Sequence, residues 1–305
     1  MSNTQPTVSS VNIASSRGTK KPADTIKLSP GGVEGDIHQH SGHREVSLLD
    51  EKHINDFINI SQAAKHPGYG AFAENITTKN LPETLQVYDF LEIGNVLLMV
   101  TQIGKPFHEE LEFPGHYVSP QKAVFCKVIR GGTIQPGATI NHKPKVFKTL
   151  IITLSTRAYQ QIYDDKSGPL IETYISEFFK QENLEAEITK KILPDNSREL
   201  STLLESSQEY DFILTTGGTG IAETDITIET VSPLLSKEIP GIPEMIRWRY
   251  GLENPNALLS RSLLGTMDQT VIFCMPGSPK AIQEYMEEFM KTTKHIIQMI
   301  NELKH

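Results

Sequence analysis

A stretch rich in glycine and threonine, Thr215-Thr-Gly-Gly-Thr-Gly220, follows directly after an apolar run that ends at Leu214. Glycine lets a backbone approach a ligand closely, and exposed N–H groups that lead into a helix attract anions. The three threonine hydroxyls add donors, and the carboxylate of Asp225 could hold Mg²⁺ against phosphate oxygens. This spacing favours a phosphate site. Two simpler interpretations stay open, because the stretch could be a plain tight turn and Asp225 could cap a helix over residues 227–235.

Polar residues also follow three other predicted strands. They are Ser155-Thr-Arg157, then Asp195 after a proline, and the small-residue turn Met275-Pro-Gly-Ser-Pro-Lys280. Parallel strands present their carboxyl ends at one edge of a sheet, where ligands bind. The acids Asp164 and Asp165, which precede a predicted helix, add to the same edge. Together these residues suit a phosphorylated ligand with a divalent metal better than four unrelated turns.

The second half of the chain must supply the strands that position these residues. Apolar runs alternate there with stretches of helical periodicity, which predicts a mainly parallel sheet with helices on both sides. The predicted strands cover residues 149–154, 186–193, 211–214 and 271–274, and the predicted helices cover 170–179, 197–207 and 282–303. Ser197 is the predicted N-cap of the middle helix.

The first half has a different pattern. Short apolar or alternating runs such as 96–103 and 123–129 are separated by glycine and proline, with a turn at 135–137 and one helix near 51–60. This pattern predicts a β-rich, barrel-like domain. We place the first domain at residues 1–143 and the α/β domain at 148–305, with Asn141–Lys145 as the linker.

Composition limits the classes of partner. The net charge of −8 and the pI of about 5.7 argue against nucleic acid or an anionic membrane. Lys20 and Lys21 form only a short basic patch, which we interpret as a solvated loop. Cys126 and Cys274 lie in apolar runs and are expected to be core residues. With no visible signal peptide or membrane-spanning run, we expect a cytoplasmic protein.

Several motifs of the second half together resemble the molybdopterin-binding domain of the Mog/MoaB type. They are TTGGTG with Asp225, DDKSGP (164–169), PGIPEMIR (240–247), ALLSRS (257–262) and MPGSPKA (275–281), within residues 148–300. The resemblance implies an enzyme of molybdenum cofactor biosynthesis that adenylylates molybdopterin with MgATP and releases pyrophosphate. It implies small-molecule pterin and nucleotide substrates, other biosynthesis proteins as partners, and a homo-oligomer, commonly a trimer.

The resemblance also assigns residues. Asp195 and Asp225 are the implied catalytic acids and Mg²⁺ ligands. The implied cofactor-binding residues are Ser155, Thr215, Thr216, Gly217, Gly218, Thr219, Gly220, Glu244, Ser260, Ser262, Pro276, Gly277 and Ser278.

Two positions depart from that family. Thr224 stands where an arginine usually precedes the second acid, and Thr156 stands where an aspartate usually follows the serine of the first strand end. The lost arginine removes a fixed cation that could anchor phosphate. A non-catalytic carrier of molybdopterin or of the molybdenum cofactor is therefore the alternative.

A histidine-rich segment in the first half has two interpretations. His38, His40 and His43 invite a zinc hydrolase, or else form a polar rim. The stretches 32–51, 71–81 and 100–110 resemble a MOSC domain over residues 8–142, which implies a pocket for a cofactor-related ligand. The implied pocket residues are Asp36, His38, His43, Arg44, Glu74, Asn75 and Thr77. The cysteine usual in that family is Phe107 here, which argues against sulfur transfer.

Overall fold

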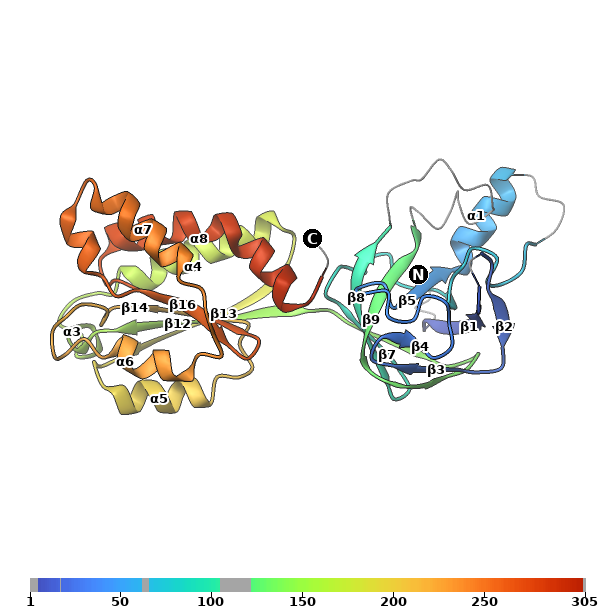
Figure 1. Cartoon of the computed structure of the whole chain (residues 1–305), viewed down its shortest axis with the longest axis horizontal. Coiled ribbons are helices and arrows are strands. Elements are labelled where there is room, and N and C mark those ends of the chain that lie inside the picture. Colours follow the sequence, from blue (N-terminus) through green and yellow to red (C-terminus); the bar gives the residue numbers. More distant parts are fainter. Residues whose placement is uncertain (1–4, 17, 62–65, 105–121, 304–305) are drawn as a thin grey trace. The chain divides into compact units, whose positions relative to one another are not determined.

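The computed structural model describes residues 5–16, 18–61, 66–104 and 122–303. The chain divides into two compact units, Met1–Lys145 with Asn301–His305, and Val146–Ile300 (Figure 1). Three of the five residues expected as a linker belong instead to strand β11 (Ile140–Lys143), which pairs with β7 (Phe90–Ile93). The change between the units falls at Lys145. Within the described residues, no helix combines the length and apolar character needed to span a bilayer.

The first unit is built on an eight-stranded sheet. In spatial order its strands are β11, β7, β8 (Val96–Ile103), β9 (Val124–Arg130), β5 (Val46–Asp50), β6 (Ile76–Lys79), β1 (Thr7–Ile13) and β2 (Lys21–Ala23). A smaller sheet contains β10 (Gly132–Ile134), β3 (Ile26–Ser29) and β4 (Gly32–Val33), and helix α1 spans Glu51–Ser61. The predicted helix and the predicted strands β8 and β9 are confirmed.

The large sheet curls until its two ends meet. The backbone N–H of Val8 donates to Ala138 O at 2.8 Å, and that of Ile140 donates to Pro6 O at 2.9 Å. These bonds connect the segment before β11 to β1, on the opposite side of the sheet order. Inward-facing apolar side chains, among them Val11 and Leu48, fill the interior. The first unit is therefore β-rich and curled, as predicted.

The second unit has three layers around a six-stranded sheet. In spatial order the strands are β13 (Glu185–Leu193), β12 (Val146–Leu154), β14 (Phe212–Thr216), β17 (Thr270–Met275), β16 (Leu263–Met267) and β15 (Lys237–Glu238). The first four are parallel, and β16 and β15 add an antiparallel edge that the sequence did not predict.

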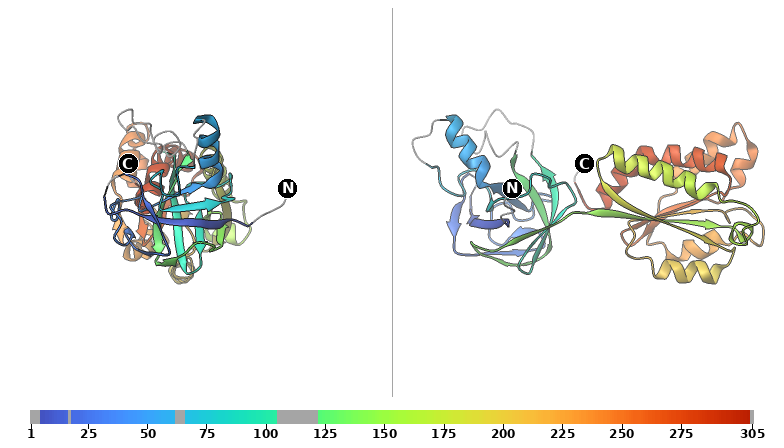
Figure 2. Two further views of the ribbon diagram at one scale, coloured as in Figure 1. Left: turned by 90° about the vertical axis from the view of Figure 1, so that its right-hand side faces the viewer. Right: turned by 180° about the vertical axis from the view of Figure 1, so that it is seen from behind.

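Helices cover both faces of this sheet. They are α3 (Thr156–Tyr159), α4 (Ser167–Gln181), α5 (Ser197–Glu205), α6 (Thr227–Val231), α7 (Gly241–Gly251) and α8 (Pro279–Ile300), with 3-10 turns η1 (Ser232–Leu234) and η2 (Pro255–Leu259). Figure 1 shows α4, α7 and α8 on one face and α5 and α6 on the other. The same arrangement is seen from behind in Figure 2. Asn196, not Ser197, caps α5, since its side chain accepts the N–H groups of Arg198 and Glu199.

Alternate side chains of the central strands pack against the two helical layers. On the face of α5, Leu150, Ile152 and Ile213 join Leu200 and Leu204 of that helix in one core. On the face of α4 and α8, aromatic rings pack against one another, with edge contacts of Phe212 to Phe179 and Phe289 at 6.0 and 6.5 Å between centroids. Because both faces are covered, these strands contain long apolar runs, which explains why the sequence revealed them.

The central aromatic packing predicts a large stability loss on truncation. Phe212→Ala should lower the free energy of unfolding of the second unit by about 3–5 kcal/mol, because the side chain is 1% exposed and its removal leaves a cavity. Urea unfolding followed by the fluorescence of Trp248, the single tryptophan, measures this. The matched control Tyr159→Ala truncates a side chain that is 55% exposed and should change that energy by under about 0.5 kcal/mol. A loss below about 1 kcal/mol for Phe212→Ala would contradict this account of the core.

Candidate functional site

The carboxyl ends of the four parallel strands lie at one edge of the second sheet. The register pairs Leu154 with Leu193, Thr153 with Thr216, and Thr216 with Met275. All four strands therefore stop within a residue or two of one another, and their loops emerge together. The structure thus brings the predicted strand-end residues to one edge, as the parallel pattern required.

Asp195 is attached to the end of β12. Its Oδ2 accepts the backbone N–H of Thr156 at 2.9 Å and the Thr156 hydroxyl at 2.8 Å, while Ser155 N donates to Leu193 O at 2.9 Å. Thr156 takes the place of the aspartate usual in the resembling family, and it gives Asp195 a neutral donor. A second carboxylate at that position would repel Asp195.

The glycine-rich loop makes a direct backbone contact with its neighbours. Gly217 has a φ of +100°, and a Cβ there would lie 2.3 Å from the carbonyl oxygen of Leu154. A Cβ on Gly277 would lie 3.4 Å from the Cα of Gly217, so the loops after β14 and β17 touch. Gly217 N donates to Met275 O at 3.0 Å. Only glycine fits position 217, both for its φ and for its space.

The first two threonines of the predicted loop lie inside the sheet. Thr215 and Thr216 belong to β14 and are at most 1% exposed. The Thr216 hydroxyl donates to Pro276 O at 2.9 Å, and Thr215 neighbours the thiol of Cys274, whose pKa burial raises to about 12. Thr219 is also buried. The strand therefore continues two residues beyond its apolar run, and the donor role of these three hydroxyls stays a prediction.

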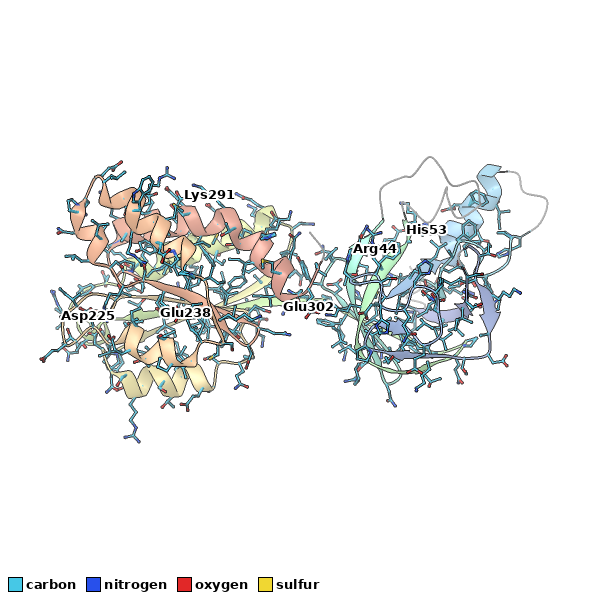
Figure 3. The ribbon with its side chains drawn as sticks, viewed as in Figure 1. Arg44, His53, Asp225, Glu238, Lys291 and Glu302 are labelled. Carbon is cyan, nitrogen blue, oxygen red and sulfur yellow. The ribbon has the colours of Figure 1, made fainter. Side chains whose placement is uncertain are left out.

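Asp225 closes a loop and does not cap a helix. Its Oδ2 accepts the N–H of Ala222 at 2.9 Å, and a Cβ on Gly220 would lie 2.6 Å from the same oxygen. Helix α6 begins at Thr227 and has no side-chain cap at Ile226. The helix-cap interpretation is therefore wrong, and the half-buried carboxylate stays at the strand edge. Figure 3 shows Asp225 at the end of the second unit where Figure 1 shows α3.

Two cavities open beside these loops. A cavity of about 520 Å³ lies between the ends of β12 and β14 and the start of α4, with Ser155, Tyr163, Asp164, Lys166 and Gly277 in its wall. The hydroxyls of Ser155 and Tyr163 are 2.7 Å apart. A second cavity of about 350 Å³ is lined by residues 221–223, 225, 226, 229 and 261. Each cavity thus contains carboxylate oxygens and a cation.

Sequence reasoning missed Asp165 as an organising residue. Its Oδ1 accepts the N–H groups of Ser167 and Gly168, and its Oδ2 accepts the hydroxyl of Thr153 at 2.7 Å. The Ser167 hydroxyl in turn donates to Gly277 O at 2.8 Å. Asp165 therefore accepts the first two backbone N–H groups of α4 and connects this helix to β12. An acid two residues before Ser-Gly was the available signal.

The remaining predicted residues differ in their contacts. Ser262 Oγ lies 2.9 Å from the Tyr285 hydroxyl, which also donates to Ser260 at 3.3 Å. Ser278 Oγ accepts the N–H of Ala281 in the first turn of α8. Glu244 lies exposed in the first turn of α7, and among the described contacts it joins none of those that connect the strand-end loops.

The predicted MOSC positions of the first unit meet in a buried polar network. The ammonium of Lys20 lies 2.6 Å from both oxygens of Asp36, and Asn75 donates to Asp36 at 3.2 Å. Thr77 donates to Glu74 at 2.8 Å beside them. Burial would raise the pKa of Asp36, but hydrogen bonds from His38 and Lys20 lower it below its usual range. Lys20 is 3% exposed, so its interpretation as a solvated loop residue is wrong.

The histidines do not share one face. His38 Nδ1 lies 3.4 Å from Lys20 Nζ, whereas His43 Nε2 lies 3.1 Å from Gln102 Oε1 and His40 occupies a turn at φ +64°. Across residues 5–16, 18–61, 66–104 and 122–303, no group of three histidine, cysteine, aspartate or glutamate side chains is arranged to hold a metal. The zinc-hydrolase interpretation has no support in these residues.

Arg44 lies next to the same glutamine. Its Nε donates to Gln102 Oε1 at 2.8 Å, and its guanidinium lies over the Phe125 ring at 5.6 Å. His43 and Arg44 thus form a second polar group in the first unit. Phe107, the departure from the MOSC pattern, lies outside the described residues.

Comparison with known proteins identifies the second unit. A family model described as a probable molybdopterin binding domain matches residues 150–295. The molybdenum cofactor biosynthesis protein B of Staphylococcus epidermidis is 37% identical over 165 residues, which are 52% of this chain and 92% of that protein. Gephyrin of Dictyostelium discoideum is 35% identical over 159 residues, which span 50% of this chain and only 22% of gephyrin.

A solved structure shows the same coverage. The tungsten cofactor synthesizing protein MoaB from Pyrococcus furiosus is 33% identical, with a TM-score of 0.46, and the match covers 52% of this chain and 98% of that one. The resemblance of residues 8–142 to MOSC domains stays a prediction. Through residues 150–295, the chain belongs to the family of molybdenum cofactor biosynthesis proteins of the MoaB and Mog type.

Proposed function

We propose that the second unit adenylylates molybdopterin with MgATP. The observation that carries this proposal is the gathering of Asp195, Asp225 and the glycine-rich loop at one sheet edge, where Asp225 lines the smaller cavity and Gly277 lines the larger one. Two cavities allow a pterin and a nucleotide to be held at once. The match to a probable molybdopterin binding domain supports a pterin as one of the two substrates.

In this reaction the protein has to position the substrates and neutralise their negative charge, and it does not have to supply a nucleophile. A phosphate oxygen of molybdopterin attacks the α-phosphorus of ATP, a new P–O bond forms, and the bond to the bridging oxygen breaks as pyrophosphate leaves with the electron pair. Holding the two phosphates in line accounts for much of such a rate enhancement. When bound, Mg²⁺ neutralises the charge that builds on the leaving oxygens.

The residues present fit a magnesium ion and a phosphate. Asp195 and Asp225 offer the hard carboxylate oxygens that Mg²⁺ prefers, with phosphate oxygens and water completing its shell. The three glycines let this loop pack tightly at the sheet edge, because a Cβ on Gly217, Gly218 or Gly220 would lie 2.3, 2.4 or 2.6 Å from Leu154 O, Thr227 Oγ1 or Asp225 Oδ2. Lys166 is exposed at the larger cavity and supplies a mobile cation there.

The carrier alternative keeps one specific observation in its favour. Thr224 leaves the position before Asp225 without the arginine usual in the resembling family. A carrier would bind molybdopterin tightly and release no pyrophosphate, so the assay below separates the two functions.

Asp225→Asn should lower the rate of ATP-dependent pyrophosphate release with molybdopterin by about 100-fold or more, because the amide loses the charge that holds the metal. The measurement is pyrophosphate release by wild type and variant, with Mg²⁺ and again with EDTA, which should abolish it. Asp268→Asn, the same change in an exposed turn, is the matched control and should keep the wild-type rate.

The fold should survive this substitution, so the melting temperature is measured alongside. Full turnover in Asp225→Asn would remove the assigned role. Tight pterin binding by wild type without any pyrophosphate would favour the carrier.

We also propose that the first unit binds a ligand related to the same cofactor. The supporting observation is that its seven matched positions gather into two polar groups, one around Asp36 and one where His43 and Arg44 meet Gln102. Of the two, the group of His43 and Arg44 has the cation that would suit an anionic ligand, whereas the Asp36 group contains two carboxylates and one paired ammonium and would fix the backbone around it.

This second proposal predicts two molybdopterin sites per chain when ATP is absent. Arg44→Ala should reduce the binding stoichiometry from two to one, because it removes the cation of the first unit, and equilibrium dialysis with pterin fluorescence measures this. Arg130→Ala, which removes a half-exposed cation paired with Glu92, is the control and should keep two. One site in wild type, or two in Arg44→Ala, would rule this proposal out.

A further inference from the structure

Arg261 connects the strand edge to the loop that carries Asp225. It lies between Ser260 and Ser262, just before β16, and its backbone N–H donates to Thr219 O at 3.0 Å. Ser262 is in turn fixed by Tyr285 of α8. The main chain at Arg261 is therefore held from both sides before its side chain makes any contact.

The guanidinium holds both ends of one loop. Its Nε donates to Gly220 O at 2.7 Å, and Nη2 donates to Asp225 O at 3.2 Å. The remaining donors pair with the carboxylate of Glu229 on α6. Only the planar fork of arginine can bind three acceptors in these directions, so lysine cannot replace it.

The loop between those two carbonyls needs such support. Residues 221–224 are exposed, and the described contacts inside the loop are two bonds between Ala222 and Asp225. With Gly220 O and Asp225 O both fixed, the Asp225 carboxylate has little freedom to move. We propose that Arg261 is a positioning residue that sets the geometry of Asp225 for the metal and phosphate, an inference that rests on the proposed function.

Charge favours a positioning role over direct phosphate binding. Glu229 raises the pKa of Arg261 through their hydrogen bond and also balances its charge. A neutralised guanidinium offers an incoming phosphate little net attraction, yet it keeps its fixed donors. Arg261 thus supplies fixed donors beside Asp225, where Thr224 has replaced the usual arginine.

The test compares Arg261→Ala and Arg261→Lys with wild type. In both variants kcat for pyrophosphate release should fall roughly 100-fold while the KM for molybdopterin changes less than about threefold, because a misplaced acid affects the transition state most. Adding methylguanidinium should restore at least a tenth of the wild-type kcat in Arg261→Ala and nothing in Asp225→Asn. A variant that had lost activity through general unfolding would not show that chemical rescue.

Arg249→Ala is the matched control, since it breaks another arginine–glutamate pair, with Glu288 at 2.7 Å, on α7 and α8. It should keep the wild-type kcat. An unchanged kcat in Arg261→Ala, or a loss that methylguanidinium does not rescue, would overturn the proposal.

Amide hydrogen exchange separates this inference from the proposed function. Exchange over residues 218–226 should rise at least tenfold in Arg261→Ala, with methylguanidinium reversing it, while the other strands keep wild-type protection. If wild type releases no pyrophosphate, the proposed function fails, and the exchange data still decide whether Arg261 fixes the loop. Unchanged exchange in that segment would refute it.

Discussion

The close approach of Gly217 to the carbonyl of Leu154 is the constraint on which the candidate site depends. A Cβ at that position would lie 2.3 Å from the carbonyl oxygen, so no other residue lets the ends of β12 and β14 stay in register. Gly277 then packs on Gly217, which brings the loop after β17 to the same place. One strand end and two loops from distant parts of the sequence thus meet through backbone contact, and Leu154 and Gly277 also line the larger cavity.

The two acids are held in different ways around this centre. Asp195 accepts two bonds from Thr156, which fixes it directly to the end of β12. Asp225 bonds to its own loop, and Arg261 donates to the carbonyl at each end of that loop. The two acids therefore differ in what holds them: one is bonded to a strand end, and the other lies in a loop whose two ends contact a single arginine.

Sequence patterns revealed the parallel strands because burial on both faces makes them continuously apolar. They did not reveal β16, because Gly265 interrupts its pattern, and the structure needs that glycine where a Cβ would lie 2.4 Å from Lys237 O. Two polar residues also led to wrong predictions of exposure. Thr216 reads as a loop residue, yet its hydroxyl is satisfied by Pro276 O inside the sheet. Lys20 reads as solvated, yet its partner Asp36 lies sixteen residues away, beyond any local pattern.

Lys20 and Asp36 form a buried ion pair in the first unit. Burial of two charges costs more than an exposed pair does, and apolar replacements often stabilise a fold as well or better. His38 and Asn75 also donate hydrogen bonds to Asp36. Asp36 therefore accepts more hydrogen bonds than pairing with Lys20 alone would provide. In the second unit Thr216 and Thr227 donate to backbone carbonyls, whereas in the first unit the Lys20–Asp36 ion pair lies next to the exposed side chain of His38. The polar side chains of the first unit are thus fixed in a hydrogen-bonded network. Those of the second unit lie on loops that the backbone contact at Gly217 brings together.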